Sequence, residues 1–261
     1  MGPLSLAELD SIKSNLVEPE LDLCFKQGQV DPPVKEFGFR LSAERESKLY
    51  DHIASLEARD ILKRGKVGSG KFTSPGFAVR KSGDRIGLVV KYCSLNSRLE
   101  LPNGIMYHDA SRFAQSIPSF AKFYTVLEVK DAFHRVKIAE SAIPFLHMSV
   151  YHSTGWREYA WQRAPQGLSC SPAFWIQLIE EIVRVLKNFL LSSKNEELPQ
   201  LLADNVIIVY ADDLLIAGKT SESSRRLGDI AKREDSTWRR SYYHGYVLAR
   251  GPSISGSETH R

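Results

Sequence analysis

Two adjacent carboxylates, Asp212 and Asp213, lie between two short apolar runs and are the residues best suited to chemistry in this sequence. The runs, 205–210 and 214–217, have the length and branched side chains of buried strands, so the acids are expected between two strands. A Mg²⁺ ion binds through one or two carboxylates together with substrate phosphates. Acids held by rigid strands suit such a hard cation, although a solvent-facing loop is the ordinary alternative for an Asp-Asp pair alone.

A third carboxylate for such a site is available at Glu128, in the run Thr125-Val126-Leu127-Glu128-Val129. Successive side chains of a strand point to opposite faces. Leu127 and Val129 are therefore predicted to pack on helices while Glu128 faces an open cleft. Each acid taken alone is more often a surface charge, so the hypothesis depends on the three acting together.

A loop before a helix forms the next candidate segment. It contains Pro165-Gln166-Gly167 and ends at Ser171-Pro172, a typical helix start. Such a loop would present Gln166 and free backbone amides to a ligand, and the N-terminus of the helix would favour phosphate. In isolation, an ordinary connecting loop is the better interpretation of this segment.

The elements that position these residues follow from apolar periodicity. We expect helices over 6–16, over 41–58 and for about 20 residues from Pro172, a basic hairpin from 77–79 and 86–92, a strand at the start of 125–138, a hairpin within 148–161, and strands over 205–210 and 214–217. Strands and helices are interleaved rather than strictly alternating, which indicates an α+β fold.

The composition excludes several classes of protein. Of 261 residues, 43% are hydrophobic and 25% are charged, as in globular proteins and unlike disordered chains. No apolar run approaches the roughly 18 residues of a membrane span, and no targeting signal is recognisable. The three cysteines are widely separated, which argues against a zinc site or a disulfide framework. We therefore expect no membrane partner and an intracellular, reducing location rather than secretion.

The net charge of +4 is too mild to establish a polyanionic partner by itself. Basic residues are concentrated after residue 221, where a solvated tail is the simplest interpretation.

In order along the chain, these segments resemble the reverse transcriptases of LTR retrotransposons and retroviruses over residues 31–219. Residues 124–138, with Asp-Ala-Phe at 131–133, resemble the first palm motif. Pro-Gln-Gly at 165–167 with Ser-Pro at 171–172 resembles the second, and Tyr-Ala-Asp-Asp at 210–213 resembles the third. Ser74-Pro75, Val79-Arg80-Lys81 and Leu95-Asn96 resemble the fingers.

The resemblance implies a right-hand polymerase with fingers and a palm, the palm being an antiparallel sheet with helices packed on one face. It implies an N-terminal extension with a short helix at 1–30, fingers at 31–103, and a palm at 104–219 with an inserted fingers hairpin at about 139–165. Residues 220–261 would be a basic tail, in which 243–248 faintly resemble a primer-grip hairpin. No thumb would follow, as in a fragment of a longer polyprotein from which other domains are missing.

The activity implied is RNA-directed DNA polymerisation with two Mg²⁺ ions, for which Mn²⁺ can substitute. Glu128, Asp212 and Asp213 would be both the catalytic and the metal-binding residues. The partners would be deoxynucleoside triphosphates and an RNA or DNA template with its primer. The implied nucleotide-binding residues are Lys81, Asp131, Ala132, Phe133 and Gln166, and the implied primer and template contacts are Pro165, Gly167 and Tyr210. Among these, Lys81 would contact the triphosphate and Phe133 would stand under the sugar.

Several positions depart from the family pattern. Glu128 stands where the family has Asp, which adds one methylene to a metal ligand. In the fingers, Gly87, Lys91 and Cys93 replace an arginine, an acid and a second arginine. The alternative hypothesis is therefore a decayed, inactive copy that at most binds a primer-template. A third hypothesis, an unrelated RNA-binding module, lacks the platform aromatics that such modules use.

Overall fold

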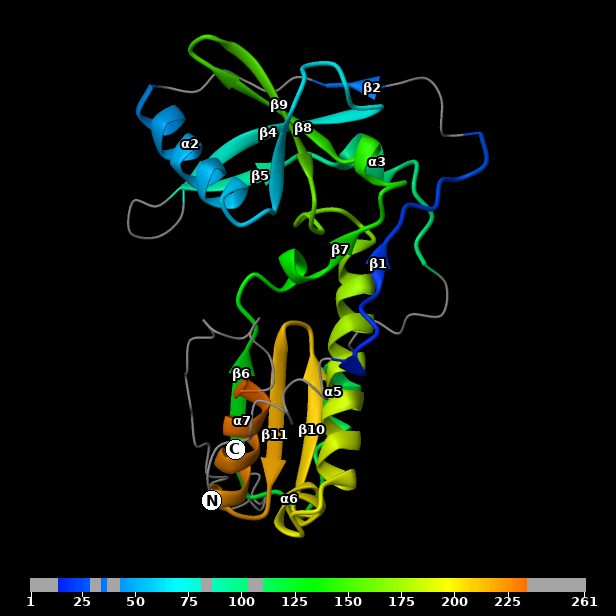
Figure 1. Cartoon of the computed structure of the whole chain (residues 1–261), viewed down its shortest axis with the longest axis vertical. Helices are drawn as coiled ribbons and strands as arrows, with labels where there is room; N and C mark the ends of the chain where they lie inside the picture. The colour runs from blue at the N-terminus through cyan, green and yellow to red at the C-terminus, as the bar shows by residue number, and fades with distance from the viewer. Residues whose placement is uncertain (1–13, 29–33, 37–42, 81–85, 103–109, 234–261) are drawn as a thin grey trace, which may run out of the picture. The chain divides into compact units, whose positions relative to one another are not determined.

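The computed structural model describes residues 14–28, 34–36, 43–80, 86–102 and 110–233, and these form two compact units (Figure 1). One unit contains a six-stranded sheet and residues 131–178. The other contains a three-stranded sheet and residues 179–233. The helix α5 (Ser171–Ser192) begins in the first unit and ends in the second. None of the helices in these ranges is long and apolar enough to cross a membrane.

The six-stranded sheet has the order β2-β4-β8-β9-β3, with β5 paired to β4. Its strands are β2 (Val34–Lys35), β3 (Leu62–Gly65), β4 (Phe72–Arg80), β5 (Ile86–Val90), β8 (His147–His152) and β9 (Gly155–Trp161). The first half of β4 pairs in parallel with β2 and β8, and its second half pairs with β5 in antiparallel fashion. The helix α2 (Ala43–Glu57) packs on β3, β4 and β5 through Leu49, Ile53 and Leu56, which are fully buried.

The end of α2 is closed by a Schellman motif. The N–H of Ile61 donates to the carbonyl of Leu56, and the N–H of Asp60 donates to the carbonyl of Glu57. Asp60 has a φ of 52°, the left-handed conformation in which glycine is the usual residue. The turn therefore fixes the direction of the preceding residue, Arg59, at the end of the helix.

A buried carboxylate holds the glycine-rich loop between β3 and β4. Glu158 of β9 accepts hydrogen bonds from the N–H groups of Gly68 and Gly70 at 2.7 and 2.9 Å, and its Oε1 lies 2.6 Å from Nδ1 of His147. Burial acts to raise the pKa of Glu158, but these hydrogen bonds outweigh it and the pKa lies below its usual value. A Cβ at Gly70 would lie 2.6 Å from the His147 ring, so this close approach requires glycine.

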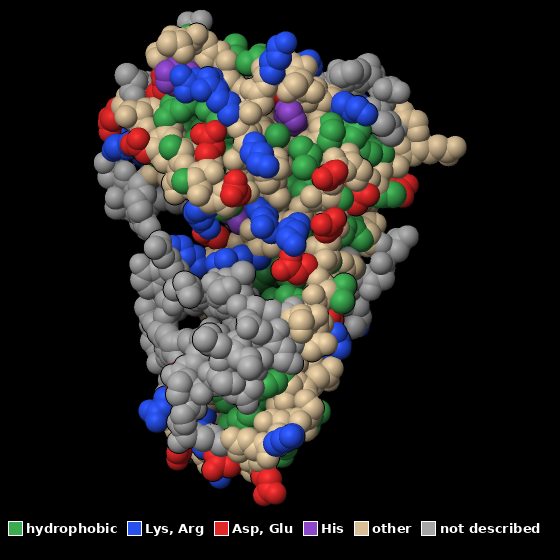
Figure 2. All heavy atoms as spheres, in the orientation of Figure 1, with side chains coloured by type: hydrophobic (Ala, Val, Ile, Leu, Met, Phe, Trp, Pro, Cys, Tyr) green, Lys and Arg blue, Asp and Glu red, His purple; other side chains and the backbone are tan. Residues whose placement is uncertain are grey.

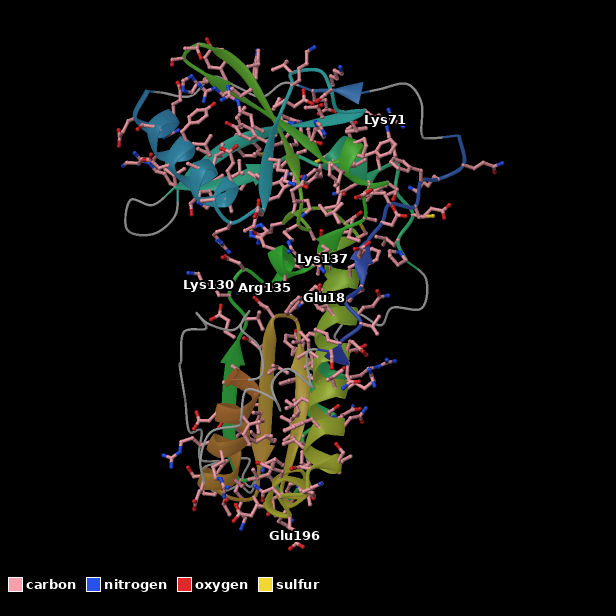
Figure 3. The ribbon with its side chains drawn as sticks, viewed as in Figure 1. Glu18, Lys71, Lys130, Arg135, Lys137 and Glu196 are labelled. Atoms are coloured by element: carbon pink, nitrogen blue, oxygen red, sulfur yellow. The ribbon has the colours of Figure 1, made fainter. Side chains whose placement is uncertain are left out.

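A segment before α2, residues 18–26, joins two other parts of the same unit, and we name it the N-terminal strap. Within it, β1 (Glu20–Leu21) pairs in parallel with β7 (Lys137–Ile138), and Glu18 forms an ion pair of 2.7 Å with Lys137 (Figure 3). The other end of the strap bonds to residues 98–100, where Lys26 N–H donates to the Arg98 carbonyl. Leu21 is fully buried, so the strap is part of the packed unit.

The three-stranded sheet is antiparallel and has the order β10-β11-β6. Its strands are β6 (Phe123–Glu128), β10 (Asn205–Tyr210) and β11 (Asp213–Gly218), and its helices are α4 (Ala110–Gln115), the end of α5, α6 (Glu197–Ala203) and α7 (Ser221–Arg233). One face carries Leu127, Ile207, Leu214 and Ile216, all buried. The helix α7 packs on this face, where Ser224 Oγ lies 2.8 Å from Thr125 Oγ1.

The opposite face carries Glu128, Asp213 and Tyr210 at one end, because these residues are paired across the three strands. The Tyr210 ring contacts Phe113 of α4, with ring centroids 5.0 Å apart. Helices therefore touch both faces of the sheet, in contrast to the sequence-based expectation of one covered face.

The periodic elements lie close to their predicted positions. The helix predicted at 41–58 is α2, the helix predicted from Pro172 is α5, and the hairpins predicted at 148–161 and 205–217 are β8–β9 and β10–β11. The expected helix at 6–16 and the faint primer-grip match at 243–248 fall mainly or wholly outside the described residues.

Two expectations were wrong. The strand β4 begins at Phe72 rather than 77, because Thr73 and Ser74 are buried between neighbouring strands despite their polarity. Residues 221–233 form the helix α7 rather than a solvated tail, because Leu227 and its neighbours at helical spacing are buried against the sheet.

Candidate active site

The sheet register places Glu128 directly opposite Asp213. These residues are Cα partners in the antiparallel pair of β6 and β11, so their side chains point to the same face. Along β6 and beyond it, Leu127 and Val129 are buried while Glu128 is exposed, which confirms the predicted alternation. The ladder continues past the strand, since Val129 N–H donates to the Asp212 carbonyl at 2.9 Å. Two acids far apart in the chain thus face each other on rigid strands.

A tight turn carries the remaining acid. Tyr210 pairs with Asp213, so Ala211 and Asp212 form a two-residue connection between β10 and β11. Ala211 has a φ of 52°. The favoured two-residue hairpin turns require a positive φ at this position, which glycine normally adopts. An alanine in this region costs about 1 kcal/mol or more of strain. Asp212 is exposed in the turn, next to the facing pair of carboxylates.

The electrostatics at this end of the sheet fit a cation. The pKa of Asp213 is raised, first by its partial burial and then by the negative charges of Asp212 and Glu128. Carboxylate oxygens are the ligands that Mg²⁺ prefers, and a bound cation would relieve this repulsion. Within the described ranges, no group of three or more His, Cys, Asp or Glu side chains is gathered closely enough to hold an ion. The carboxylate oxygens are thus the right kind of donor for a hard cation, but the three acids do not by themselves form a closed site.

The Pro-Gln-Gly loop is held by an asparagine from another part of the six-stranded unit. Asn96, at the end of α3 (Cys93–Asn96), donates from Nδ2 to the carbonyl of Gly167 at 3.0 Å and accepts from the N–H of Ser169 at 2.9 Å. Gly167 has a φ of 93°, which suits glycine, while Pro165 is buried and its carbonyl accepts from Ser171 Oγ. Gln166 is exposed between them.

The segment from Asp131 to Arg135 forms a short 3₁₀ turn after a left-handed residue. Asp131 has a φ of 54°, and its carboxylate forms an ion pair of 2.8 Å with Arg59. Ala132 is buried and Phe133 is half-buried. His134 packs against Trp161, and burial lowers the pKa of His134 to about 4. The imidazole is therefore neutral at physiological pH.

The other sequence-predicted positions lie as follows. Lys81 falls outside the described residues. Gly87 is buried in β5, whereas Lys91 and Cys93 are exposed. Glu128, Asp212 and Asp213 belong to the three-stranded unit. The six-stranded unit contains Asp131, Ala132, Phe133, Pro165, Gln166 and Gly167.

Two residues of the six-stranded unit contact predicted site positions but had no role assigned by sequence reasoning. Arg59 contacts Asp131, and Asn96 contacts the Pro-Gln-Gly loop. Arg59 carries no local pattern, because its contact with Asp131 depends on the turn at Asp60. Asn96 stands in a recognised Leu-Asn pair, and a polar residue at the end of a short helix was the available signal.

Comparison with known proteins gives an independent result. Residues 96–239, more than half of the chain, match the family model for reverse transcriptase (RNA-dependent DNA polymerase). A putative enzymatic polyprotein of Cassava vein mosaic virus is 26% identical over 193 residues, covering 72% of this chain and 24% of the polyprotein.

Two retroviral proteins are also similar. The Gag-Pol polyprotein of Bovine immunodeficiency virus is 23% identical over 184 residues, covering 66% of this chain and 11% of its own length. The Gag-Pol polyprotein of Rous sarcoma virus subgroup C is 25% identical over 164 residues, covering 60% of this chain and 9% of its own. The chain thus spans a quarter or less of the length of these relatives.

Proposed function

The chain belongs to the reverse transcriptase (RNA-dependent DNA polymerase) family, and we propose that it is the polymerase module of a retroelement polyprotein. Its reaction would add deoxynucleotides to a primer 3′-hydroxyl, directed by an RNA or DNA template. The observation that carries this proposal is the register of β6 against β11, which sets Glu128 opposite Asp213 beside the Asp212 turn. We further propose that the three-stranded unit is the core of the palm and that the six-stranded unit is the fingers.

In this mechanism the facing carboxylates act as ligands. Glu128, Asp212 and Asp213 would hold Mg²⁺ or Mn²⁺ ions, which when bound lower the barrier to attack by the primer hydroxyl and to departure of pyrophosphate. Burial, and after it the negative charges of Asp212 and Glu128, raise the pKa of Asp213, so a bound cation would relieve this repulsion. The pairing of β6 with β11 fixes the backbone of Glu128 opposite that of Asp213, so these two side chains would start on the same face of the sheet.

The remaining residues would orient the substrates. By family resemblance, Lys81 and the backbone at Asp131 and Ala132 would support the triphosphate, and Phe133 and Gln166 would contact the sugar. Pro165, Gly167 and Tyr210 would contact the primer or template. Figure 2 shows Lys and Arg side chains spread over the visible face of the six-stranded unit. The exposed cations of this unit include Lys63, Lys66 and Lys71. Cationic side chains of this kind bind the phosphates of nucleic acids without sequence preference.

Primer extension tests the proposal. The protein would be mixed with a primed RNA template and deoxynucleotides, in Mg²⁺ and separately in Mn²⁺. We expect extension that Asp212→Asn abolishes and that the matched control Asp51→Asn, an exposed residue on α2, leaves unchanged. Extension that survives in Asp212→Asn would contradict the assignment of the metal ligands.

A second candidate function is binding of a primer-template without catalysis. The specific observation in its favour is Glu128, whose extra methylene displaces a metal ligand, and a displacement of about 1 Å can cost on the order of a hundredfold in rate. Duplex binding without extension in either metal would support this alternative.

We predict that Glu128→Asp raises the extension rate, because it shortens the side chain that faces Asp213. An unchanged or lower rate in single-turnover extension would count against a metal-binding role for Glu128. The control is Glu180→Asp, an exposed residue on α5, for which no change is expected.

A further inference from the structure

We propose that Arg59 is a positioning residue for nucleotide binding, because it holds and neutralises the carboxylate of Asp131. The inference rests on the proposed function, in which the backbone at Asp131 and Ala132 supports a triphosphate. Arg59 Nη2 lies 2.8 Å from Asp131 Oδ2, and the two side chains are 44% and 31% exposed. A deoxynucleoside triphosphate could therefore approach this pair from solvent.

The arginine is held from its own side by the end of α2. The two hydrogen bonds of the Schellman motif, from Asp60 and Ile61, close the turn immediately after Arg59. The turn is anchored in the core, since Leu56 and Ile61 are both buried. Because the backbone at Arg59 is fixed on a helix end, its guanidinium can serve as a stable partner for a residue 72 positions further along the chain.

The aspartate is held from the other side by a strained turn. Asp131 is left-handed, and its carbonyl accepts the N–H of His134 at 2.9 Å, which closes the first turn of the 3₁₀ segment. Buried Ala132 and the contact of His134 with Trp161 anchor that segment. A left-handed residue other than glycine persists where its surroundings fix it, and such strain is concentrated at functional sites. The ion pair with Arg59 is one of the contacts that fix it.

Charge explains why the pair matters for nucleotide binding. A carboxylate beside a triphosphate-binding backbone repels the ligand, whose charge is several negative units. Arg59 offsets that charge, and its guanidinium has five N–H donors, of which one nitrogen engages Asp131. Family resemblance leads one to expect an arginine from the fingers strand at the position of Gly87, where this chain has no side chain. Without that arginine, an unneutralised Asp131 carboxylate would repel the triphosphate more strongly, so its neutralisation by Arg59 matters more.

The test measures nucleotide binding separately from catalysis. The full chain would be bound to a primer-template whose primer ends in a dideoxynucleotide, and the dissociation constant of the next correct deoxynucleoside triphosphate would be measured in Mg²⁺. We expect Arg59→Ala to weaken binding about fivefold and Arg59→Lys to restore most of the loss. The control Arg45→Ala removes an exposed arginine near the start of α2 and should leave binding unchanged.

A double variant separates neutralisation from direct contact with phosphate. Asp131→Asn removes the carboxylate, and Asn tolerates the left-handed conformation. We expect the nucleotide dissociation constant of the double variant, Arg59→Ala with Asp131→Asn, to lie within about twofold of that of Asp131→Asn alone, because no carboxylate charge is left to neutralise. In extension assays, if the wild type is active, the loss in Arg59→Ala should appear in KM rather than kcat.

Three results would overturn the inference: a double variant as weak as Arg59→Ala alone, an Arg59→Ala variant that binds as well as the wild type, or a wild-type complex that binds no nucleotide. Failure of the proposed polymerase activity gives a different result. A wild type that binds nucleotide on the terminated primer but extends no primer would refute catalysis, while the variants would still decide the role of Arg59.

Discussion

Glu158 in the six-stranded unit and Asp213 in the three-stranded unit are both carboxylates on strands, but their surroundings shift their pKa values in opposite directions. Two backbone N–H groups and His147 stabilise the charge of Glu158, and its pKa is lowered. Burial and two neighbouring acids destabilise the charge of Asp213, and its pKa is raised. Glu158 is satisfied within the protein, whereas the neighbours that shift the pKa of Asp213 in the described part of the chain are acids, so Asp213 would gain from a bound cation. The difference marks one carboxylate as structural and the other as a candidate ligand.

The largest expected effect is the loss of stability when Glu158, the structural carboxylate, is removed. Glu158→Ala leaves the N–H groups of Gly68 and Gly70 and the His147 ring without their buried acceptor. We expect a loss of about 2–4 kcal/mol in the free energy of unfolding, measured by urea denaturation. The control Glu180→Ala, on the exposed side of α5, should change stability by less than about 0.5 kcal/mol. If Glu158→Ala lost less than about 1 kcal/mol of unfolding free energy, Glu158 would not be a structural carboxylate and its contrast with Asp213 would fail.

For Asp213, the candidate metal ligand, we expect removal of the charge to increase stability rather than decrease it. Asp213→Asn removes a repelled charge and should raise the melting temperature by about 2–4 °C in the absence of divalent metal. The wild type should be stabilised by added Mg²⁺ through preferential binding to the folded state, and Asp213→Asn should lose most of this response. A variant that keeps the full Mg²⁺ response, or that melts lower than the wild type without metal, would refute the assignment.

The same contrast gives a pH dependence of smaller size. The pKa of Glu158 is lower in the folded state, so its contribution to stability is present above its usual value of 4.5 and is lost as pH falls through the folded value. Glu158→Gln should therefore lose less stability than the wild type on acidification below about pH 4.5. Asp213 has the opposite sign, because its raised pKa means that stability falls as pH rises above its usual value of 3.8. Urea midpoints of the wild type, Glu158→Gln and Asp213→Asn would be measured across this range. The differences from the wild type would show whether the two carboxylates make opposite contributions to the pH dependence of stability.

The smallest expected effect concerns strain. Ala211 and Asp60 both have a φ of 52°, one beside the acids and the other at the end of α2. Glycine at either position should stabilise the protein by about 1 kcal/mol, as measured by urea denaturation. We expect Ala211→Gly also to weaken the Mg²⁺ response, because a freer turn holds Asp212 less firmly, whereas Asp60→Gly should not. Equal Mg²⁺ responses in the two variants would show that strain at Ala211 is unrelated to the ligands.

Much of this arrangement could be predicted from local patterns. The apolar periodicity of α5 and of the β10–β11 hairpin is strong, and the alternation around Glu128 predicted which side of β6 is exposed. These features depend on neighbouring residues in the chain, which is the information that a periodic pattern contains.

Features that depend on distant contacts could not be predicted in the same way. No local pattern specifies that Glu128 pairs with Asp213, since register across strands is set by the whole sheet. Thr73 and Ser74 have a polar, loop-like appearance, yet burial between strands overrides their local preference. Arg59 meets Asp131, which lies 72 positions further along the chain, so no pattern around either residue indicates the ion pair. The interactions missing from the sequence analysis are those between segments that come together only in the folded chain.

The N-terminal strap has a practical consequence for recombinant work. A protein shortened to start at residue 31, where the resemblance to known polymerases begins, would lack Leu21 and the backbone partners of β7. Hydrophobic surface and strand edges that are covered in the longer chain would then face water, which favours aggregation during expression. Poor yield from such a shortened version would reflect the missing strap rather than a defect in the segments that carry the acids.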